Sequence, residues 1–317
     1  MRILITGGTG YIGSYLVHKF SQDSRVDEIY IMARHYKDFL SRYKEKVRFM
    51  SQDITDLEGL RERIAKIKPD VVLHLAAALK GNYMRFIGTN VVGTIHVLEA
   101  VKDQPIRLLV FASTAANLYG NAVYRPIDEG HPLNPISFYG LSKQMAEDAT
   151  RFYALRFKVP VVIFRQTNVY GWAPVMKMTL INAFIESVLK ERKIRIFGTG
   201  KQQRNFLHID DLARYYEAII FYDDPEELRG EIFNVAGPQT ATILDVARMV
   251  KEISEKEFNL KVEIRYEDEK RVRKFEVYDF PISYEKARKI LGVKPRIDLR
   301  TGIRMELKRR MRELGGG

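Results

Sequence analysis

The fold of this 317-residue chain is decided by the stretch Thr6-Gly7-Gly8-Thr9-Gly10-Tyr11-Ile12-Gly13. The stretch follows a short β-branched run and opens a pattern with helical spacing of apolar residues. Glycines at these spacings permit a tight turn, a close approach of backbone to a pyrophosphate, and close packing of helix on sheet. The first helical turn offers free N–H groups and the positive end of its dipole to phosphates. Because of this position between strand and helix, we predict a dinucleotide-binding turn rather than an ordinary glycine-rich loop. Its predicted cofactor-binding residues are Gly7, Gly10, Tyr11, Ile12 and Gly13.

Strand and helix patterns alternate over the first two-thirds of the chain. The predicted strands are Arg2–Thr6, Glu28–Ala33, Val47–Met50, Val71–Leu75, Leu108–Ser113 and Pro160–Arg165. The predicted helices are Tyr11–Phe20, Leu57–Ile67, Asn90–Val101 and Phe138–Phe157. Such alternation forms a parallel sheet covered on both faces by helices. We therefore predict an α/β fold with a Rossmann-type doubly wound parallel sheet in residues 1–171, to which parts of 205–240 return. A smaller C-terminal substrate-binding region is expected in residues 172–317.

The composition limits the available chemistry. The chain has no cysteine, which excludes disulfides, zinc–thiolate sites and cysteine nucleophiles, and its six scattered histidines predict no metal site. The net charge of 52 − 40 = +12 fits an anionic partner or a densely charged, solvated surface. No basic stretch interleaved with aromatic residues is present, so we expect no nucleic-acid partner. No apolar run reaches the roughly 20 residues of a membrane span, and the first ten residues do not resemble a secretory signal. We expect no membrane partner and a cytoplasmic location.

The end of the second predicted strand bears on the choice of cofactor. In a simple NAD site, an acidic residue at this place binds the ribose 2′-hydroxyl. Here the strand ends Ala33-Arg34-His35, so the carboxylate is missing and an arginine is present. A guanidinium can pair with a 2′-phosphate through charge-assisted hydrogen bonds. We therefore favour NADP(H), bound through Arg34, and keep NAD(H) as the alternative in which Arg34 is a solvated loop residue.

A tyrosine and a lysine four residues apart, Tyr139 and Lys143, lie on one face of a predicted helix. A nearby ammonium favours the phenolate, so we expect Lys143 to lower the pKa of Tyr139 from about 10 toward neutrality. Such a tyrosine can take a proton from a hydroxyl or return it. The same spacing starts at Tyr15 and at Tyr266, but only the pair at 139 opens a helix after a strand that ends in hydroxyl residues.

That strand ends in Ser113 and Thr114 and is followed by Ala115-Ala116-Asn117. A hydroxyl at this place can hydrogen-bond the reacting oxygen and share its proton. Alternatively, the two hydroxyls only satisfy backbone groups of the loop. We rank Thr114 first and Ser113 second as the catalytic hydroxyl.

With these three elements in order, the chain resembles the extended short-chain dehydrogenases/reductases, the nucleotide-sugar epimerase and dehydratase family, over nearly its whole length. The resemblance implies a nucleotide-sugar substrate and further contacts along the chain. Besides Tyr139 and Lys143, the implied cofactor contacts are Asp53, Ile54, Leu75, Ala76, Ala77, Asn90 and Thr167. The implied substrate contacts are Thr114, Asn168, Arg204 and Arg273. His74, which precedes Leu75, is expected to be a packed strand-end residue rather than a catalyst.

The resemblance leaves the reaction open. The 4,6-dehydratases of the family need an acidic residue after the hydroxyl, where this chain has Ala115-Ala116-Asn117, and branches that use a cysteine acid are excluded. Two reactions remain: 4-epimerisation through a 4-keto intermediate, which we favour narrowly, and NADPH-dependent reduction of a 4-keto sugar. A third hypothesis is a non-catalytic nucleotide-binding scaffold, against which the intact Tyr139/Lys143 pair counts. Members of the family commonly pair through two helices, so we expect a homodimer formed by residues 90–101 and 138–157.

Overall fold

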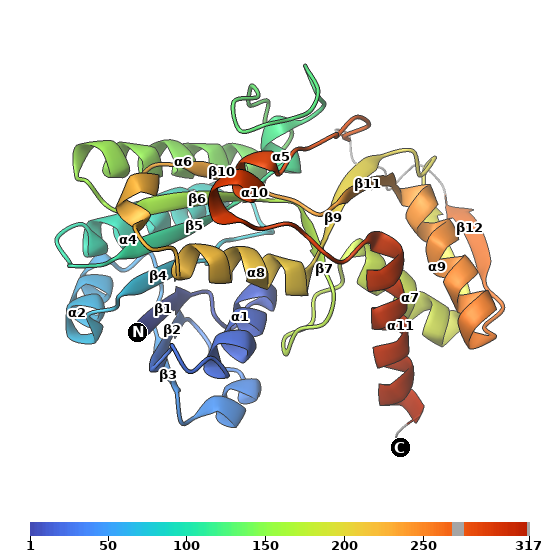
Figure 1. Cartoon of the computed structure of the whole chain (residues 1–317), viewed down its shortest axis with the longest axis horizontal. Coiled ribbons are helices and arrows are strands. Elements are labelled where there is room, and N and C mark those ends of the chain that lie inside the picture. Colours follow the sequence, from blue (N-terminus) through green and yellow to red (C-terminus); the bar gives the residue numbers. More distant parts are fainter. Residues whose placement is uncertain (268–275, 316–317) are drawn as a thin grey trace.

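The structure is a computed structural model that describes residues 1–267 and 276–315, and a parallel sheet lies at its centre (Figure 1). The strands of this sheet are β1 (Arg2–Thr6), β2 (Glu28–Ala33), β3 (Val47–Ser51), β4 (Val71–His74), β5 (Leu108–Thr114), β6 (Val161–Gln166) and β10 (Ile232–Val235). They run in the order β10-β6-β5-β4-β1-β2-β3. The order reverses between β1 and β4, which is the place where doubly wound sheets bind ligands. The predicted α/β fold with a Rossmann-type sheet is confirmed.

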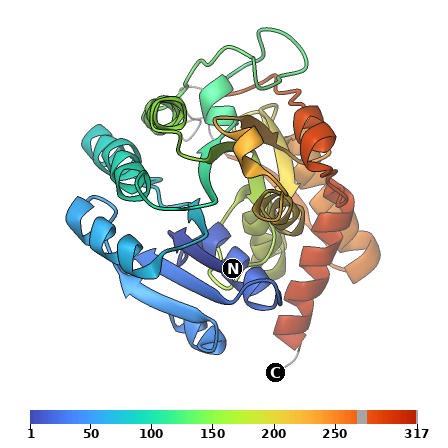
Figure 2. The same ribbon diagram turned by 60° about the vertical axis from the view of Figure 1, so that its left-hand side comes forward.

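Helices cover both faces of this sheet (Figure 2). One face carries α2 (Leu57–Ile67), α4 (Gly93–Val101) and α6 (Phe138–Arg156). The other carries α1 (Tyr11–Ser21), α8 (Ile209–Ile220) and α10 (Glu285–Leu291). Because side chains alternate across a strand, Leu4 of β1 packs with the first group, whereas Ile3 and Ile5 pack with the second. Burial on both faces explains why these strands are nearly continuous apolar runs.

The helix predicted over Asn90–Val101 begins earlier than its apolar pattern indicates. Asn82 caps the short helix α3 (Tyr83–Phe86) by accepting a hydrogen bond from the backbone N–H of Arg85 at 3.0 Å. A π-helical segment, η2 (Ile87–Val92), joins α3 to α4. The expected start was therefore wrong by about two turns, because a capping asparagine outweighs the weak pattern of residues 83–89.

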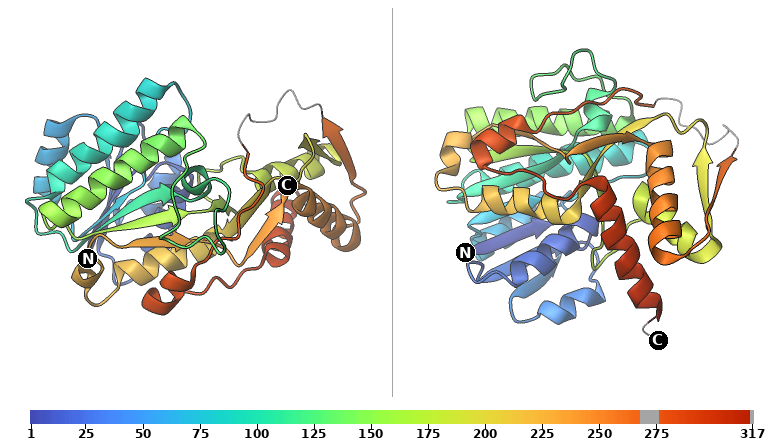
Figure 3. Two further views of the ribbon diagram at one scale, coloured as in Figure 1. Left: turned by 90° about the horizontal axis from the view of Figure 1, so that it is seen from above. Right: turned by 45° about the vertical axis from the view of Figure 1, so that its right-hand side comes forward.

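A second, smaller region is built from elements that come after β6 in the chain (Figure 3, right). Its helices are α7 (Leu180–Glu191), α9 (Ile243–Phe258) and α11 (Leu299–Gly315). Its strands form a three-stranded sheet of β7 (Asn168–Tyr170), β9 (Gln203–His208) and β11 (Gln239–Thr242), and a pair of β8 (Lys193–Phe197) and β12 (Glu263–Glu267). These elements share a core of their own, separate from the two cores on the large sheet.

Several elements connect the two regions. β10 pairs in parallel with β6 at the edge of the large sheet, and α8, which directly follows β9, packs on the same face as α1. The remaining short elements are α5 (Ala116–Tyr119) and the 3-10 turns η1 (Asp38–Tyr43) and η3 (Pro225–Leu228). Among the residues that the structure describes, no helix is long and apolar enough to cross a membrane.

The packing of α1 against the turn before it yields a test of the fold. A Cβ on Gly13 would lie 2.4 Å from the carbonyl oxygen of Gly7 and 2.7 Å from Cα of Gly8. These are backbone atoms, which can move away only at a cost in free energy. We therefore expect Gly13→Ala to lower the free energy of unfolding by about 1–3 kcal/mol, the usual cost of overpacking. Urea denaturation of the purified variant measures this change.

Gly88→Ala provides the matched control, because a Cβ on Gly88 meets no atom within 4 Å. Alanine is favoured over glycine in a helix by roughly 0.5–1 kcal/mol, so this variant should be as stable as the wild type or slightly more stable. Equal stability of the two variants would contradict the close approach at Gly13.

Candidate active site

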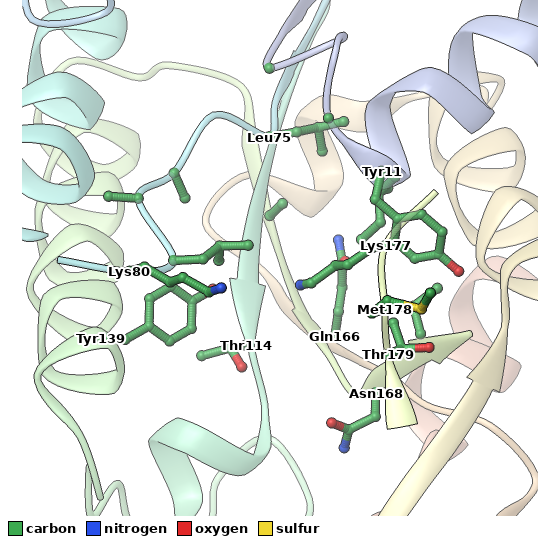
Figure 4. Close-up of a pocket in the computed structure, with 18 of the residues that line it drawn as sticks. Tyr11, Leu75, Lys80, Thr114, Tyr139, Gln166, Asn168, Lys177, Met178 and Thr179 are labelled. Carbon is green, nitrogen blue, oxygen red and sulfur yellow. The ribbon is translucent and has the colours of Figure 1, made fainter. Parts of the chain in front are cut away.

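A cleft of about 1600 Å³ opens at the carboxyl ends of the parallel strands. Residues that follow β1, β2, β3 and β4, and the ends of β5 and β6, all line it, because parallel strands present the same end to one edge of the sheet. The cleft continues to the smaller region, where Arg204 and Phe206 of β9 line it. Figure 4 shows Tyr139 and Thr114 on one side of this space and Tyr11 and Asn168 on the other.

The glycine-rich turn forms one end of the cleft. Gly7 has a φ of +73°, and a Cβ there would lie 2.8 Å from the backbone nitrogen of Ala76. Gly10 is the N-cap of α1, where no side chain caps the helix and no acidic residue stands in the first turn. The free N–H groups and the dipole of α1 are therefore open to an anion. All five turn residues predicted to bind the cofactor line the cleft.

The segment after β4 forms a wall of the cleft with Leu75, Ala76 and Ala77. A buried histidine at the end of β4 holds this wall in place. The Nδ1 of His74 lies 2.7 Å from Oγ1 of Thr6, and its Nε2 lies 3.0 Å from Oγ1 of Thr94. Thr94 donates its own hydroxyl proton to the carbonyl oxygen of Asn90, so His74 donates from Nε2 and accepts at Nδ1. Burial lowers the pKa of His74 to about 3. His74 is thus a neutral structural residue that ties β1 to α4.

Asn90, which was expected to bind the cofactor, is not among the residues that line the cleft. Its side chain is buried, where Oδ1 accepts from the N–H of Ala78 at 2.7 Å and Nδ2 donates to the Oγ of Ser142 at 2.9 Å. Its contact with a cofactor stays a prediction, and the hydrogen bonds of its side chain give it a positioning role. Asn90 holds the wall after β4, which includes the lining residues Leu75, Ala76 and Ala77, against α6.

The start of α6 brings the expected catalytic groups to the end of β5. Ser137 caps the helix by accepting from the N–H of Gly140 at 3.0 Å. A Cβ on Gly140 would lie 2.2 Å from the carbonyl oxygen of Asn117, so glycine is required for the helix to approach this closely. Tyr139 and Lys143 of α6 therefore line the same cleft as Ser113 and Thr114 of β5.

Burial sets the charge states of the two α6 residues. Only 2% of Lys143 is exposed, its Nζ lies 4.0 Å from the centre of the Phe111 ring, and burial lowers its pKa to about 7 while Glu147 opposes this shift. Burial raises the pKa of Tyr139 to about 12. The expected lowering of the Tyr139 pKa by Lys143 is therefore wrong for this geometry, because the desolvation of the phenolate dominates. At neutral pH Tyr139 holds its proton.

A buried ion pair supports the face of α6 that carries Tyr139 and Lys143. Glu147, one turn beyond Lys143, accepts from Nη2 of Arg165 at 2.7 Å and from its Nε at 3.0 Å. The Nη1 of Arg165 donates to the hydroxyl of Tyr119 at 2.8 Å. Both charges are almost fully buried, so the pair fixes α6 against β6. Sequence reasoning missed Glu147, although an acid four residues after Lys143 on an inward face was a usable signal.

The two candidate hydroxyls differ in their surroundings. The Oγ of Ser113 is buried and has no hydrogen-bond partner among the described residues, whereas Thr114 is only partly buried. Both line the cleft. A buried hydroxyl without a partner that faces a cleft is available to a ligand.

Three of the four residues that the family resemblance implies for the substrate line the cleft. Besides Thr114, Asn168 and Arg204 line the cleft, as does the predicted cofactor contact Thr167, while Arg273 lies outside the described residues. The guanidinium of Arg204 is already engaged, because it forms an ion pair with Glu276 and donates to the carbonyl oxygen of Gln203 at 2.7 Å. Glu276 is a second site residue that sequence reasoning missed.

Residues at or just after the carboxyl ends of β2 and of the edge strand β3 line the other end of the cleft. Arg34 is exposed there, and within residues 1–267 and 276–315 its guanidinium has no hydrogen-bond or ion-pair partner. Asp53 and Ile54 line the same end, and Oδ1 of Asp53 accepts from the N–H and the hydroxyl of Thr55, both at 2.9 Å. Lys37 also lines this end. This end is therefore rich in positive charge.

Cationic side chains outnumber carboxylates throughout the described lining of the cleft. The cations are Arg34, Lys37, Lys80, Arg85, Lys143, Lys177, Arg195 and Arg204, against the carboxylates Asp53 and Glu276. Such a lining attracts anionic ligands. No group of three or more histidine, aspartate or glutamate side chains among the described residues is arranged to hold a metal ion.

Comparison with known proteins places this cleft in a family. Residues 3–236 match the sequence profile of the NAD dependent epimerase/dehydratase family. A putative UDP-glucose 4-epimerase of Methanocaldococcus jannaschii is 32% identical over 309 residues, which cover 95% of this chain and 96% of that protein.

Two solved structures share the whole fold. The UDP-glucose 4-epimerase of Thermotoga maritima, solved with UDP-glucose, superposes with a TM-score of 0.87 and 26% identity over 99% of this chain and 100% of its own. The UDP-glucuronic acid 4-epimerase of Bacillus cereus, solved with UDP-glucuronic acid and NAD, gives a TM-score of 0.84 and 26% identity over 97% and 98%. The chain therefore belongs to the NAD-dependent epimerase/dehydratase family of extended short-chain dehydrogenases/reductases.

Proposed function

We propose that the chain is an NAD(P)-dependent nucleotide-sugar epimerase that inverts C4 of the sugar through a 4-keto intermediate. The observation that carries the proposal is the meeting of Tyr139, Lys143 and the β5 hydroxyls in one cleft with the glycine-rich turn. The family supports a nucleotide-sugar substrate, and the names of the two 4-epimerase structures support inversion at C4.

Each side chain has a proton role in this reaction. A bound nicotinamide would supply the hydride acceptor and donor. Once its own proton has passed to solvent, Tyr139 as the phenolate takes the proton of the C4 hydroxyl during oxidation and returns it during reduction. Burial raises the pKa of Tyr139 to about 12, so its phenolate is the minor form at neutral pH and has to be stabilised by charge that arrives with the ligands as well as by the Lys143 ammonium. A hydroxyl of Thr114 or Ser113 hydrogen-bonds the same sugar oxygen and keeps it in line with Tyr139.

The residues after β5 argue against a 4,6-dehydratase. Loss of water from C5 and C6 needs a group that removes the C5 proton and a group that protonates the leaving hydroxide. Ala115, Ala116 and Asn117 stand at this place, and only Asn117 lines the cleft with a polar group. Its Oδ1 accepts from the Oγ of Ser137 at 3.0 Å. A carboxamide does not exchange protons at neutral pH, so neither role is filled.

One observation favours a second candidate, the NADPH-dependent reduction of a nucleotide 4-keto sugar. At the end of β2, Arg34 faces the cleft and no carboxylate is present, which suits the 2′-phosphate of NADPH. Both candidates use the same Tyr139 and Lys143, so the product distinguishes them.

Incubation of the purified protein with UDP-glucose tests the choice directly. An epimerase forms UDP-galactose without net consumption of nicotinamide, because the hydride that leaves C4 returns to it. Chromatography of the nucleotide-sugars and absorbance at the reduced-nicotinamide band measure the two quantities. NADPH consumption with a 4-keto sugar, and no C4 epimer from UDP-glucose or UDP-glucuronic acid, would replace the proposal by the reductase.

Tyr139→Phe should lower the turnover of this reaction by roughly two to four decades, the usual contribution of general acid–base catalysis. Cofactor binding, measured by fluorescence titration, should be retained because the glycine-rich turn is untouched. Tyr266→Phe is the matched control, since Tyr266 of β12 is 59% exposed and does not line the cleft. A fully active Tyr139→Phe enzyme would refute the mechanism.

We further propose that the enzyme prefers NADP(H) through Arg34, with NAD(H) as the alternative. The unpaired guanidinium at the β2 end and the neighbouring Lys37 support the preference, while the NAD in the solved B. cereus relative supports the alternative. A charge-assisted hydrogen bond contributes about 1.5–3 kcal/mol, which corresponds to a roughly tenfold to hundredfold preference.

Titration of both cofactors into the wild type and Arg34→Ala measures this preference. We expect the ratio of the two dissociation constants to shrink in the variant, and to shrink in the wild type as salt is added, because exposed charges are screened. If the wild type binds NAD as tightly as NADP, Arg34 is a surface charge and NAD is the cofactor.

We also propose a homodimer that forms through α6 and the continuous helix made of α3, η2 and α4. The two helices lie side by side on one outer face of the molecule (Figure 3, left). The outward side of α6 carries a stripe of exposed apolar residues at helical spacing: Phe138, Leu141, Met145, Phe152 and Leu155. Tyr83, Met84 and Val92 of the neighbouring helix are exposed as well. Contiguous apolar patches of this kind mark interfaces in soluble proteins.

Light scattering should therefore give the mass of two chains at micromolar concentration. The variant Phe152→Glu/Leu155→Glu should give the mass of one chain, since it places two like charges from each subunit in the contact. Leu314→Glu is the control, because Leu314 is 69% exposed on α11 and lies outside the stripe. A monomeric wild type would rule the interface out.

A further inference from the structure

The C-terminal helix α11 carries one buried carboxylate, that of Glu306, on its inward side. Its buried residues Leu299, Ile303 and Leu307 pack into the core of the smaller region, beside α7 (Figure 1). Glu306 is only 5% exposed on the same helix. Burying a carboxylate costs free energy unless its oxygens are paired, so a helix position that served packing alone would be better filled by an apolar residue. The contacts of Glu306 therefore bear on a further role.

One oxygen of Glu306 holds the chain directly after β7. Its Oε1 accepts a hydrogen bond from the backbone N–H of Trp172 at 3.2 Å and lies 3.5 Å from Nε2 of His208. The Nδ1 of His208 accepts from the N–H of Asp210 at 3.3 Å, so the proton of the neutral imidazole sits on Nε2 and faces Glu306. This oxygen thus joins α11 to the ends of β7 and β9.

The other oxygen of Glu306 is bound by an arginine of the same helix. Its Oε2 accepts from Nη2 of Arg309 at 2.8 Å and from Nε of Arg309 at 3.2 Å. Burial alone would raise the pKa of Glu306, but His208 and Arg309 outweigh burial and hold this pKa below its usual value. Glu306 is therefore a carboxylate at neutral pH, and both of its oxygens are engaged.

The peptide group that Glu306 holds also binds the first residue of α1. The N–H of Trp172 and the carbonyl of Gly171 belong to one peptide group, and this carbonyl oxygen accepts from the hydroxyl of Tyr11 at 2.8 Å. Gly171 has a φ of +118°, and a Cβ there would lie 2.9 Å from Cγ2 of Ile209. Tyr11 lines the cleft, and Figure 4 shows it on the side opposite Tyr139. Glu306 and Tyr11 thus bind opposite edges of the same peptide group.

We propose that Glu306 is a positioning residue for the dinucleotide, which acts on Tyr11 through the peptide group between Gly171 and Trp172. A peptide group is planar and rigid, so a carboxylate fixed on its N–H edge sets the direction of the carbonyl on the other edge. Hydrogen bonds in a chain also polarise one another, so the negative Glu306 strengthens the acceptor that Tyr11 meets. This role rests on the proposed function, which makes Tyr11 part of a dinucleotide site.

A double-mutant cycle on cofactor affinity tests the role of Glu306. Glu306→Met fills a similar volume without an acceptor, and it should weaken the binding of NADP(H) and NAD(H) about twofold to tenfold, the range of one hydrogen bond. Tyr11→Phe breaks the hydrogen bond on the other edge of the peptide group, so adding Glu306→Met to it should weaken binding little further. Glu306→Gln should keep most of the affinity, because its carboxamide oxygen still accepts from Trp172.

Two results would overturn the role of Glu306. One is a wild-type affinity for both cofactors in Glu306→Met, and the other is a double variant in which the two losses simply multiply. Glu306→Ala repeats the cycle with a smaller side chain, so that a packing fault of methionine is not mistaken for loss of the acceptor. A wild type that binds neither cofactor refutes the proposed function instead.

The matched control separates this role from the stability of α11. Glu313→Ala removes another partner of Arg309, at 2.6 Å on the exposed side of the helix, and should leave both dissociation constants unchanged. A residue with a purely structural role would lower the melting temperature and leave dissociation constants measured well below that temperature unchanged. The emission of Trp172, the only tryptophan of the chain, gives a readout without ligand. It should shift in Glu306→Met and return toward the wild type in Glu306→Gln.

Discussion

The structure depends on a contact that only glycine permits, between the turn after β1 and its neighbours. At Gly7 the backbone lies against that of Ala76 after β4, and at Gly13 the first turn of α1 lies on the carbonyl of Gly7. Any Cβ at these places would separate β1, α1 and the β4 wall. Because they meet, the N–H groups of α1 open at the point where the strand order reverses. The opening of the α1 N–H groups into the cleft follows from this contact, whereas α6 is placed by its own close approach at Gly140.

A second constraint is the burial of charge beside Tyr139 and Lys143. Lys143 is nearly enclosed, and its neighbours are a neutral histidine, an aromatic ring and one carboxylate, Glu147, whose charge is balanced by Arg165. The site therefore carries a cation that burial makes easy to deprotonate and a phenol that burial makes hard to ionise. The protonation states of Tyr139 and Lys143 therefore respond strongly to any charge that a ligand brings into the cleft. The many unpaired cations of the lining indicate that ligands bring negative charge.

Membership of the family limits the reactions that the chain can catalyse, and particular residues of the chain limit them further. The family includes both epimerases and dehydratases, so membership of it does not distinguish between the two reactions. The distinction lies in what stands after β5, where Ala115, Ala116 and Asn117 offer no acid. In the same way the β2 end, with Arg34 and no carboxylate, bears on the cofactor rather than on the reaction.

Local signals in the sequence determined the fold class and the bounds of six strands of the large sheet, each to within one residue at either end. They also determined the positions of the glycine-rich turn and of the Tyr139/Lys143 pair. The reason is that glycine spacing, apolar runs and motif order are properties of residues that are neighbours in the sequence. Tertiary structure alone decided the rest. It showed that Asn90 braces the wall instead of lining the cleft, and that Glu276 engages Arg204. It also reversed the expected pKa shift of Tyr139, since burial depends on what the rest of the chain packs around a residue. Contacts between segments far apart in sequence, and the loss of solvent that they cause, leave no local pattern to detect.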